Sequence, residues 1–199
     1  MARRSEHSLE EIREMILKAA ESIVVEEGYA ALTMRKIAME IGYTVGSIYM
    51  VFNNMSDLVL HLNAATLDEI AALLEPEPDK SAEHNIEELA KIYLRYASSH
   101  YNRWSMIFEH RQGRNEEIPD WYRLKIEEVF QEFEGQFQKL APPCPDEEIK
   151  RVARALWAGI HGICILSLSG KLAIVGIADV EASVVLLVRN FIAGWRQAI

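Results

Sequence analysis

A helical period runs through almost the whole chain and constrains its fold more than any other feature. Between Leu9 and Val24 the apolar residues recur at offsets of three and four, which places them on one face of a helix. The period is interrupted at Gly28 and at two proline-containing segments, residues 75–79 and 142–145. No run of residues alternates as a strand would. The sequence therefore predicts an all-α protein of about nine helices, a short N-terminal unit followed by a larger helical bundle.

Composition excludes several classes of protein. The chain has 199 residues, 50% of them hydrophobic, and a formal net charge of -9, so it can bury a core and is not a disordered chain. Its two cysteines, Cys144 and Cys164, do not suggest a disulfide framework. The N-terminal residues lack the apolar segment of a signal peptide. The longest uncharged run, residues 155–170, is short for a bilayer span of roughly 20 residues, so we expect a buried helix and a cytoplasmic protein with no membrane partner.

The N-terminal unit has the pattern of a helix-turn-helix. Thr33 and Thr44 can each cap the start of a short helix, expected over residues 33–40 and 44–50. Gly42 allows the turn between them. A longer first helix would support this pair.

The chain divides into two predicted domains. Residues 1–55 form the helix-turn-helix domain, and residues 56–199 form a second domain that begins with a connecting helix at 56–74. The remaining helices are expected at residues 85–100, 101–110, 120–140, 146–169 and 179–198.

The order and spacing of residues in the first domain resemble the DNA-binding domain of the tetracycline-repressor (TetR) family. The matching residues are Gly28, Tyr29, Thr33, Ile37, Ala38, Gly42, Gly46, Tyr49, Phe52 and Leu58. The resemblance covers residues 10 to 60. It implies a bacterial, homodimeric transcription regulator, in which the second short helix reads a palindromic double-stranded operator and the C-terminal domain binds a small-molecule effector.

Candidate DNA contacts follow from this resemblance and from side-chain chemistry. They are Arg3, Arg4, Thr33, Arg35, Lys36, Thr44, Val45, Gly46, Ser47, Tyr49 and Met50. Hydroxyls and free amides at helix starts can bind phosphate oxygens. Relatives usually carry a basic or polar residue where this chain has Val45, and often an aromatic one where it has Met50. We therefore expect apolar reading of bases, such as contact with the thymine methyl group.

The charge of the first domain is unusual for a DNA-binding unit. Residues 1–63 carry six cationic and nine acidic side chains. The cations cluster, however, at Arg3 and Arg4 and at Arg35 and Lys36. Because phosphate contacts are few, we expect weak nonspecific binding and a shallow dependence of DNA affinity on salt.

The second domain is rich in aromatic residues between Tyr93 and Phe137. A mainly apolar cavity with a few polar groups is typical of a small-molecule site. The candidate pocket residues are Tyr96, Trp104, Phe108, Trp121, Tyr122, Trp157 and His161. Trp157, His161 and Gly162 resemble the motif of a TetR subgroup distinguished by Trp, His and Gly in this domain. The alternative for His161 is a hydrogen-bonded core residue.

The last two predicted helices carry long apolar faces that one chain cannot easily cover. Pairing with the same helices of a second copy would give a four-helix interface with twofold symmetry. The candidate interface residues are Leu156, Ile160, Ile163, Val184, Leu187, Val188 and Phe191.

Motifs for catalysis, cofactors or metals do not occur in the sequence. It contains no nucleophile elbow, no phosphate-binding glycine loop and no metalloprotease motif. Two histidines have helically spaced acidic neighbours, Asp57 with His61 and His84 with Glu87 or Glu88, but two ligands alone are usually solvated surface. We therefore expect neither an enzyme nor a bound metal or cofactor.

The sequence thus predicts a repressor that a small molecule releases from a palindromic operator. The alternative is a helical ligand-binding or interaction protein that has lost DNA binding.

Overall fold

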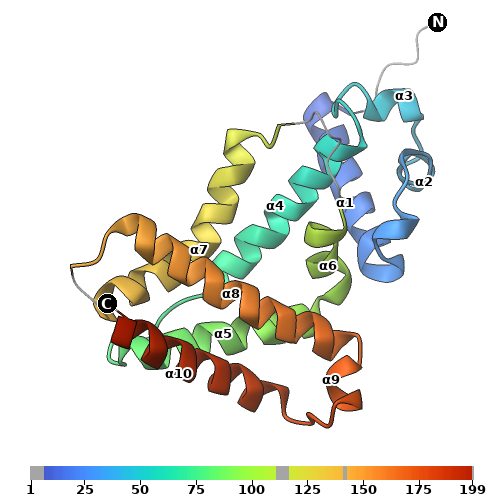
Figure 1. Cartoon of the computed structure of the whole chain (residues 1–199). Helices are drawn as coiled ribbons and strands as arrows, with labels where there is room; N and C mark the ends of the chain where they lie inside the picture. Colours follow the sequence, from blue (N-terminus) through green and yellow to red (C-terminus); the bar gives the residue numbers. More distant parts are fainter. Residues whose placement is uncertain (1–6, 111–116, 141–142, 199) are drawn as a thin grey trace, which may run out of the picture. The chain divides into compact units, whose positions relative to one another are not determined.

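The structure is a computed structural model that describes residues 7–110, 117–140 and 143–198, and every regular element among them is a helix (Figure 1). This confirms the predicted all-α fold. The elements are α1 (Leu9–Glu27), the 3-10 helix η1 (Tyr29–Ala31), α2 (Met34–Glu40), α3 (Val45–Ile48), α4 (Met55–Leu73), α5 (Ala82–Ser99), α6 (Tyr101–Glu109), α7 (Asp120–Leu140), α8 (Asp146–Leu168), α9 (Lys171–Ile174) and α10 (Val180–Ala198).

Packing divides the chain into two compact units. The first extends to Thr66 and also contains His100–Tyr122. The second contains Leu67–Ser99 and the chain from Arg123 onward. This division by packing assigns α6 to the N-terminal helices, which the period of the sequence did not indicate. The functional boundary between residues 55 and 56 stays a prediction.

The first unit is organised around α1. Ser8 caps this helix through a reciprocal pair of bonds: its hydroxyl accepts from the Glu11 backbone at 3.2 Å, and the Glu11 carboxylate accepts from the Ser8 backbone at 2.6 Å. Gly28, with φ of +81°, ends the helix. The buried face of α1 packs on α2, α3, η1 and α6. The core that results includes Ile16, Ile37, Ile48 and Phe52, and Met106 of α6 belongs to it.

The helix-turn-helix is present where the sequence predicted it. Thr33 caps α2, Gly42 takes a left-handed conformation with φ of +71°, and Thr44 caps α3. Helix α3 is shorter than predicted: it ends at Ile48, and Tyr49 follows as its cap.

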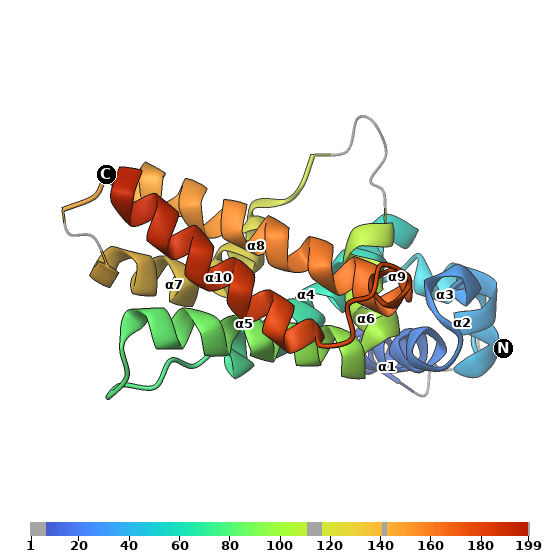
Figure 2. The same ribbon diagram turned by 60° about the horizontal axis from the view of Figure 1, so that its bottom comes forward.

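Three helices of the second unit, α5, α8 and α10, pack against one another along their lengths (Figure 2). Phe137 of α7 adds aromatic contacts to Phe191 and Trp195 of α10, at ring-centroid distances of 6.5 and 5.2 Å. The predicted break after residue 169 contains a short additional helix, α9. Its Leu172 side chain is buried.

Helix α8 is only partly buried, so the expectation of a buried helix was wrong for one of its faces. Leu156, Ile160 and Cys164 are fully buried, whereas Ile165 and Leu166 are 43% and 42% exposed. By length and composition alone α8 is apolar enough to cross a membrane, and it is the single such helix among the residues described. A helix that packs in a bundle passes the same test.

Candidate functional site

The two helix starts of the helix-turn-helix are capped by threonines. Thr33 Oγ1 accepts a hydrogen bond from the Lys36 backbone at 3.1 Å. Thr44 Oγ1 accepts from the Ser47 backbone at 3.2 Å and lies 3.1 Å from the Ser47 hydroxyl. Both threonines are exposed. These caps fix the first turns of α2 and α3. The remaining amides and hydroxyls of these two helix starts are thereby positioned where they can bind an anion.

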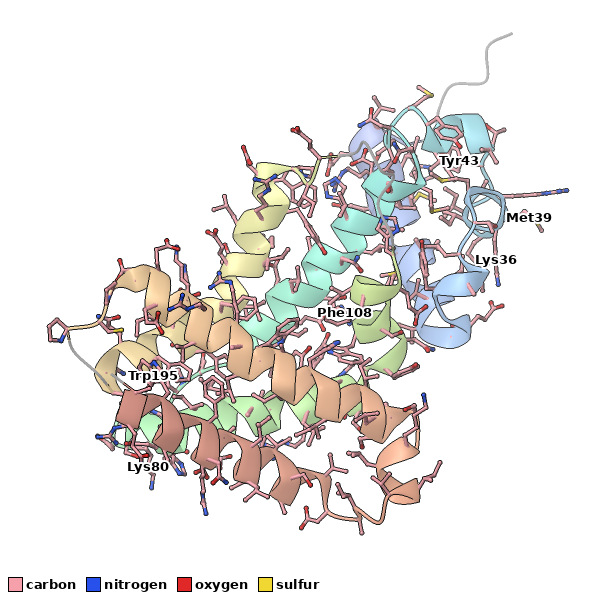
Figure 3. The ribbon with its side chains drawn as sticks, in the orientation of Figure 1. Lys36, Met39, Tyr43, Lys80, Phe108 and Trp195 are labelled. Carbon is pink, nitrogen blue, oxygen red and sulfur yellow. The ribbon has the colours of Figure 1, made fainter. Side chains whose placement is uncertain are left out.

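Large apolar side chains project from the end of α2 and from the residues that follow α3. Tyr49 is 55% exposed, Met50 is 69% exposed and Met39 is 75% exposed. In Figure 3, Met39 and Lys36 extend outward from α2. Sequence reasoning selected Tyr49 and Met50 but missed Met39, although its place between the buried positions of α2 and the turn at Gly42 indicated exposure. All three side chains are therefore exposed on the helix-turn-helix.

The cationic side chains predicted to contact DNA differ in their exposure and in their ion pairing. Arg35 is exposed. Lys36 forms an ion pair with Glu27 at the end of α1, so part of its charge is neutralised within the chain. Arg3 and Arg4 lie outside the described residues. The remaining predicted contacts of α3 also differ, because Gly46 is exposed whereas Val45 packs against the helix-turn-helix core. Val45 therefore supports the helix and presents little surface to a base.

Helix α6 is attached to α1, η1 and α4 by polar contacts. The two ring nitrogens of His110, at its C-terminal cap, each lie 3.0 Å from a hydroxyl, Nδ1 from Tyr29 and Nε2 from Ser56. Asn102 Nδ2 donates to the Val25 carbonyl at 2.9 Å. These residues lie far apart in the sequence, so no local pattern could have paired them.

A second histidine stands at the centre of an aromatic cluster in the same unit. The His61 ring of α4 stacks on Trp121 with centroids 4.7 Å apart and planes 12° apart, and the Phe52 ring meets it edge-on at 5.6 Å. Arg13 Nη2 lies 3.2 Å from His61 Nδ1. Burial, and after it the positive charge of Arg13, lowers the pKa of His61. A neutral ring can accept a hydrogen bond from the Arg13 guanidinium.

The Trp-His pair of α8 lies in an aromatic cluster of the second unit. Trp157 and His161 stack with centroids 5.1 Å apart, and Phe130 of α7 meets the Trp157 ring edge-on at 5.5 Å. The Tyr93 hydroxyl lies 3.0 Å from His161 Nδ1. Burial lowers the pKa of His161, so the neutral ring can accept the Tyr93 hydrogen bond. The Arg154 guanidinium lies over Phe130 at 4.8 Å from its centroid.

The predicted pocket residues are divided between the two units. Tyr96 lies in the second unit with Trp157 and His161. Its buried side chain donates to the Glu69 carboxylate at 2.9 Å. The other four belong to the first unit: Trp104, Phe108, Trp121 and Tyr122. Trp104 is completely buried, and the centroid of its ring lies 5.2 Å from that of Phe108.

Most of the predicted dimer residues lie inside the single chain. Four of them are fully buried in the second unit: Leu156, Ile160, Val184 and Val188. They are core residues, because α8 and α10 pack on α5. Leu187 is half-buried against Gly159, where an added Cβ would come within 2.9 Å of Leu187 Cδ2. Ile163 and Phe191 are half-buried as well. The most exposed apolar side chain of α10 is Leu186, at 65%.

Metal-binding and thiol chemistry gain no support from the geometry. In the part of the chain that the structure describes, no three His, Cys, Asp or Glu side chains gather as metal ligands would. Asp57 accepts two hydrogen bonds from Asn53, both at 2.9 Å, and lies 3.7 Å from His61. Burial raises the pKa of the Cys164 thiol to about 12, so it is not a reactive thiolate.

Both the N-terminal and the C-terminal part of the chain match known protein families. Residues 86–191 match the family described as tetracyclin repressor-like, C-terminal domain, and residues 16–62 match the bacterial regulatory proteins of the tetR family. The HTH-type transcriptional regulator TtgR of Pseudomonas putida is 37% identical over 82 residues. ArpR of Pseudomonas putida, a probable regulator of the same type, matches equally. The matched segment covers 40% of this chain and only 39% of each relative.

Solved structures share the fold over almost the full length. A protein of unknown function from Rhodococcus sp. RHA1 superposes with a TM-score of 0.71 at 21% identity, covering 98% of both chains. BioQ, solved with its double-stranded DNA operator, superposes with a TM-score of 0.63 at 20% identity, covering 91% of this chain and 98% of BioQ. The matches of residues 16–62 and 86–191 to the two family descriptions place the chain among the bacterial regulatory proteins. The chain belongs to the TetR family.

Proposed function

We propose that the chain is a homodimeric, cytoplasmic transcriptional repressor that a small molecule releases from a palindromic operator. Members of its family are transcriptional regulators, and BioQ has been solved on operator DNA. The observation that carries the proposal is the helix-turn-helix itself, in which threonines cap the starts of α2 and α3 and Tyr49, Met50 and Met39 are exposed.

The proposed docking combines a few phosphate contacts with apolar reading of bases. Thr33, Arg35 and Thr44 bind phosphates at helix starts. Lys36 contributes less, because Glu27 already pairs with it. Met50 reads bases through the thymine methyl group, and the exposed Met39 of α2 is a further apolar side chain for such a contact. Tyr49 combines a phenol that can bind phosphate with a ring that packs on the sugar backbone.

Selection of random DNA duplexes by the purified full chain tests the proposal. We expect enrichment of a palindrome, with Tyr49→Ala weakening binding to the selected duplex by about tenfold. Tyr101→Ala is the matched control, since Tyr101 is 48% exposed and lies on α6, outside the helix-turn-helix. If no sequence is enriched at any salt concentration, the chain is instead a helical ligand-binding protein that no longer binds DNA.

The effector site of this proposal is the cluster around Trp157 and His161 in the second unit. Because this cluster contains the Trp-His-Gly motif, we assign the chain to the TetR subgroup that carries it. Stacked rings, the Tyr93 hydroxyl and the Arg154 cation offer an aromatic molecule both apolar and polar contacts. A ligand releases DNA only if it binds the two conformations with different affinity. A coupling of about 1 to 3 kcal/mol changes operator affinity some 5- to 150-fold.

Operator release by a panel of aromatic compounds, followed by fluorescence anisotropy of labelled duplex, tests the effector site. A compound that releases the wild-type protein should fail to release His161→Ala, while operator affinity without the compound stays unchanged. Equal release of wild type and variant would place the effector elsewhere.

A further inference from the structure

The first unit contains a hollow of about 250 Å³ between α1, α4 and α6. Its lining includes neither the predicted DNA contacts nor the predicted effector-site residues. It is therefore distinct from both sites proposed above.

The floor of this hollow is the outer side of the helix-turn-helix core. Val24, Leu62 and Met106 line it, and all three are buried members of the core that contains Ile48 and Phe52. Leu17 and Ala65 complete the apolar lining. A molecule that filled the hollow would therefore extend the core that supports α3, and the free energy of binding would stabilise that core.

The rim of the hollow carries equal numbers of positive and negative side chains. Arg103 Nη1 lies 3.4 Å from the Glu21 carboxylate, and only 12% of the Arg103 side chain is exposed. Glu14 and Lys18, one turn of α1 apart, complete the set, and neither takes part in an ion pair among the described residues. Thr66 Oγ1 already donates to the Leu62 carbonyl at 3.2 Å. An uncharged ligand is favoured, because it leaves no net charge buried.

We propose that this hollow binds an uncharged two-ring aromatic molecule that carries a hydroxyl group. An apolar cavity of roughly 150 Å³ holds benzene, so a hollow of about 250 Å³ has room for two fused rings. The rings lie on Leu17, Leu62 and Met106. The hydroxyl group donates to the Glu14 carboxylate or accepts from the Lys18 ammonium at the rim.

The position of the hollow links its occupancy to the DNA-binding helices. His61 lines it, and the same ring meets Phe52, the residue that closes the core behind α3, at 5.6 Å. A bound molecule thus restrains both α4 and the helix-turn-helix, and we expect it to raise the melting temperature of the protein.

Isothermal titration calorimetry of the full chain with 2-naphthol tests the site without any DNA. We expect saturable binding with one molecule per chain. Ala65→Trp fills the hollow from α4 and should weaken binding by about tenfold or more. Ala72→Trp is the matched control, because Ala72 is also exposed on α4 but does not line the hollow.

Methyl NMR of protein labelled at its methionines identifies the site independently of these variants. 2-Naphthol should shift the Met106 methyl resonance, which lines the hollow, and leave those of Met39 and Met50 unchanged. Absence of binding would overturn the proposal, and so would binding that leaves Met106 unshifted. Because neither measurement involves DNA, failure to find an operator would not affect the result.

Discussion

His161 shows how a single residue can couple stability to pH. It stacks on Trp157, faces the Tyr93 hydroxyl and has a pKa below its ordinary value of 6.5 because it is partly buried. The folded state therefore binds a proton less readily than the unfolded state. Its contribution to stability is complete above pH 6.5 and is lost as pH falls toward the folded-state pKa.

We expect the free energy of unfolding to fall between about pH 7 and pH 5, and His161→Gln to make that fall smaller. Urea unfolding of both proteins at a series of pH values measures this free energy. His84→Gln is the control, because His84 lies on the surface of α5 near Glu77. If His161→Gln and wild type lose stability in parallel over this range, the burial of His161 does not govern it.

Helix α6 shows what an element gains from its packing. Its sequence neighbours are α5 and the segment that leads to α7, yet it packs on α1 and η1. Met106 is 1% exposed within the helix-turn-helix core, and Asn102 and His110 add hydrogen bonds to the same helices. The helix-turn-helix therefore depends for its stability on a helix that follows it by more than fifty residues.

Truncation of Met106 should measure that dependence. Met106→Ala removes a buried side chain and should lower the free energy of unfolding by about 2 to 5 kcal/mol, whereas Met39→Ala, at an exposed position, should change it by less than about 0.5 kcal/mol. Chemical denaturation gives both values. A loss at Met106 no larger than that at Met39 would show that α6 is not part of this core.

At the scale of the whole molecule, the surface left on α8 and α10 determines how two copies would associate. The fully buried residues of these helices belong to the chain's own core, so a dimer would use exposed side chains such as Ile165, Leu166 and Leu186. An interface on these helices remains a proposal.

Leu186→Arg should shift the protein from dimer to monomer, since it would place a charge in the proposed interface. Light scattering coupled to size-exclusion chromatography measures the mass. Leu124→Arg on α7, where the leucine is 57% exposed, is the matched control and should leave the dimer intact. A dimer unaffected by Leu186→Arg would place the interface on another surface.

The net charge of -9 also acts at this scale, because it opposes long-range attraction to DNA. Few cations face the proposed DNA surface, and Lys36 is already paired with Glu27. Operator affinity should therefore fall by less than about 10³ between 50 and 200 mM salt, the lower bound for a protein with 6 to 10 phosphate contacts. A steeper fall, measured by anisotropy, would mean that Arg3 and Arg4 or other cations contribute more contacts.

Most of the long helices of this protein could be predicted from its sequence alone, whereas the short helix α9 and the early end of α3 could not. Caps, glycines, prolines and the helical period act within a few residues, so α7 begins and ends where predicted, and α5, α8 and α10 end within a residue of prediction. Tyr49 and Met50, which the family resemblance and side-chain chemistry selected as candidate DNA contacts, are exposed.

Contacts between residues distant in the chain were decided only by the tertiary structure. The pairing of Lys36 with Glu27, the stacking of Trp121 on His61 and the inward packing of Val45 depend on how helices meet. A helical period states which face of a helix is apolar but not which neighbour covers that face. For this reason the hollow between α1, α4 and α6 could not be predicted from the sequence, and the folded chain alone reveals it.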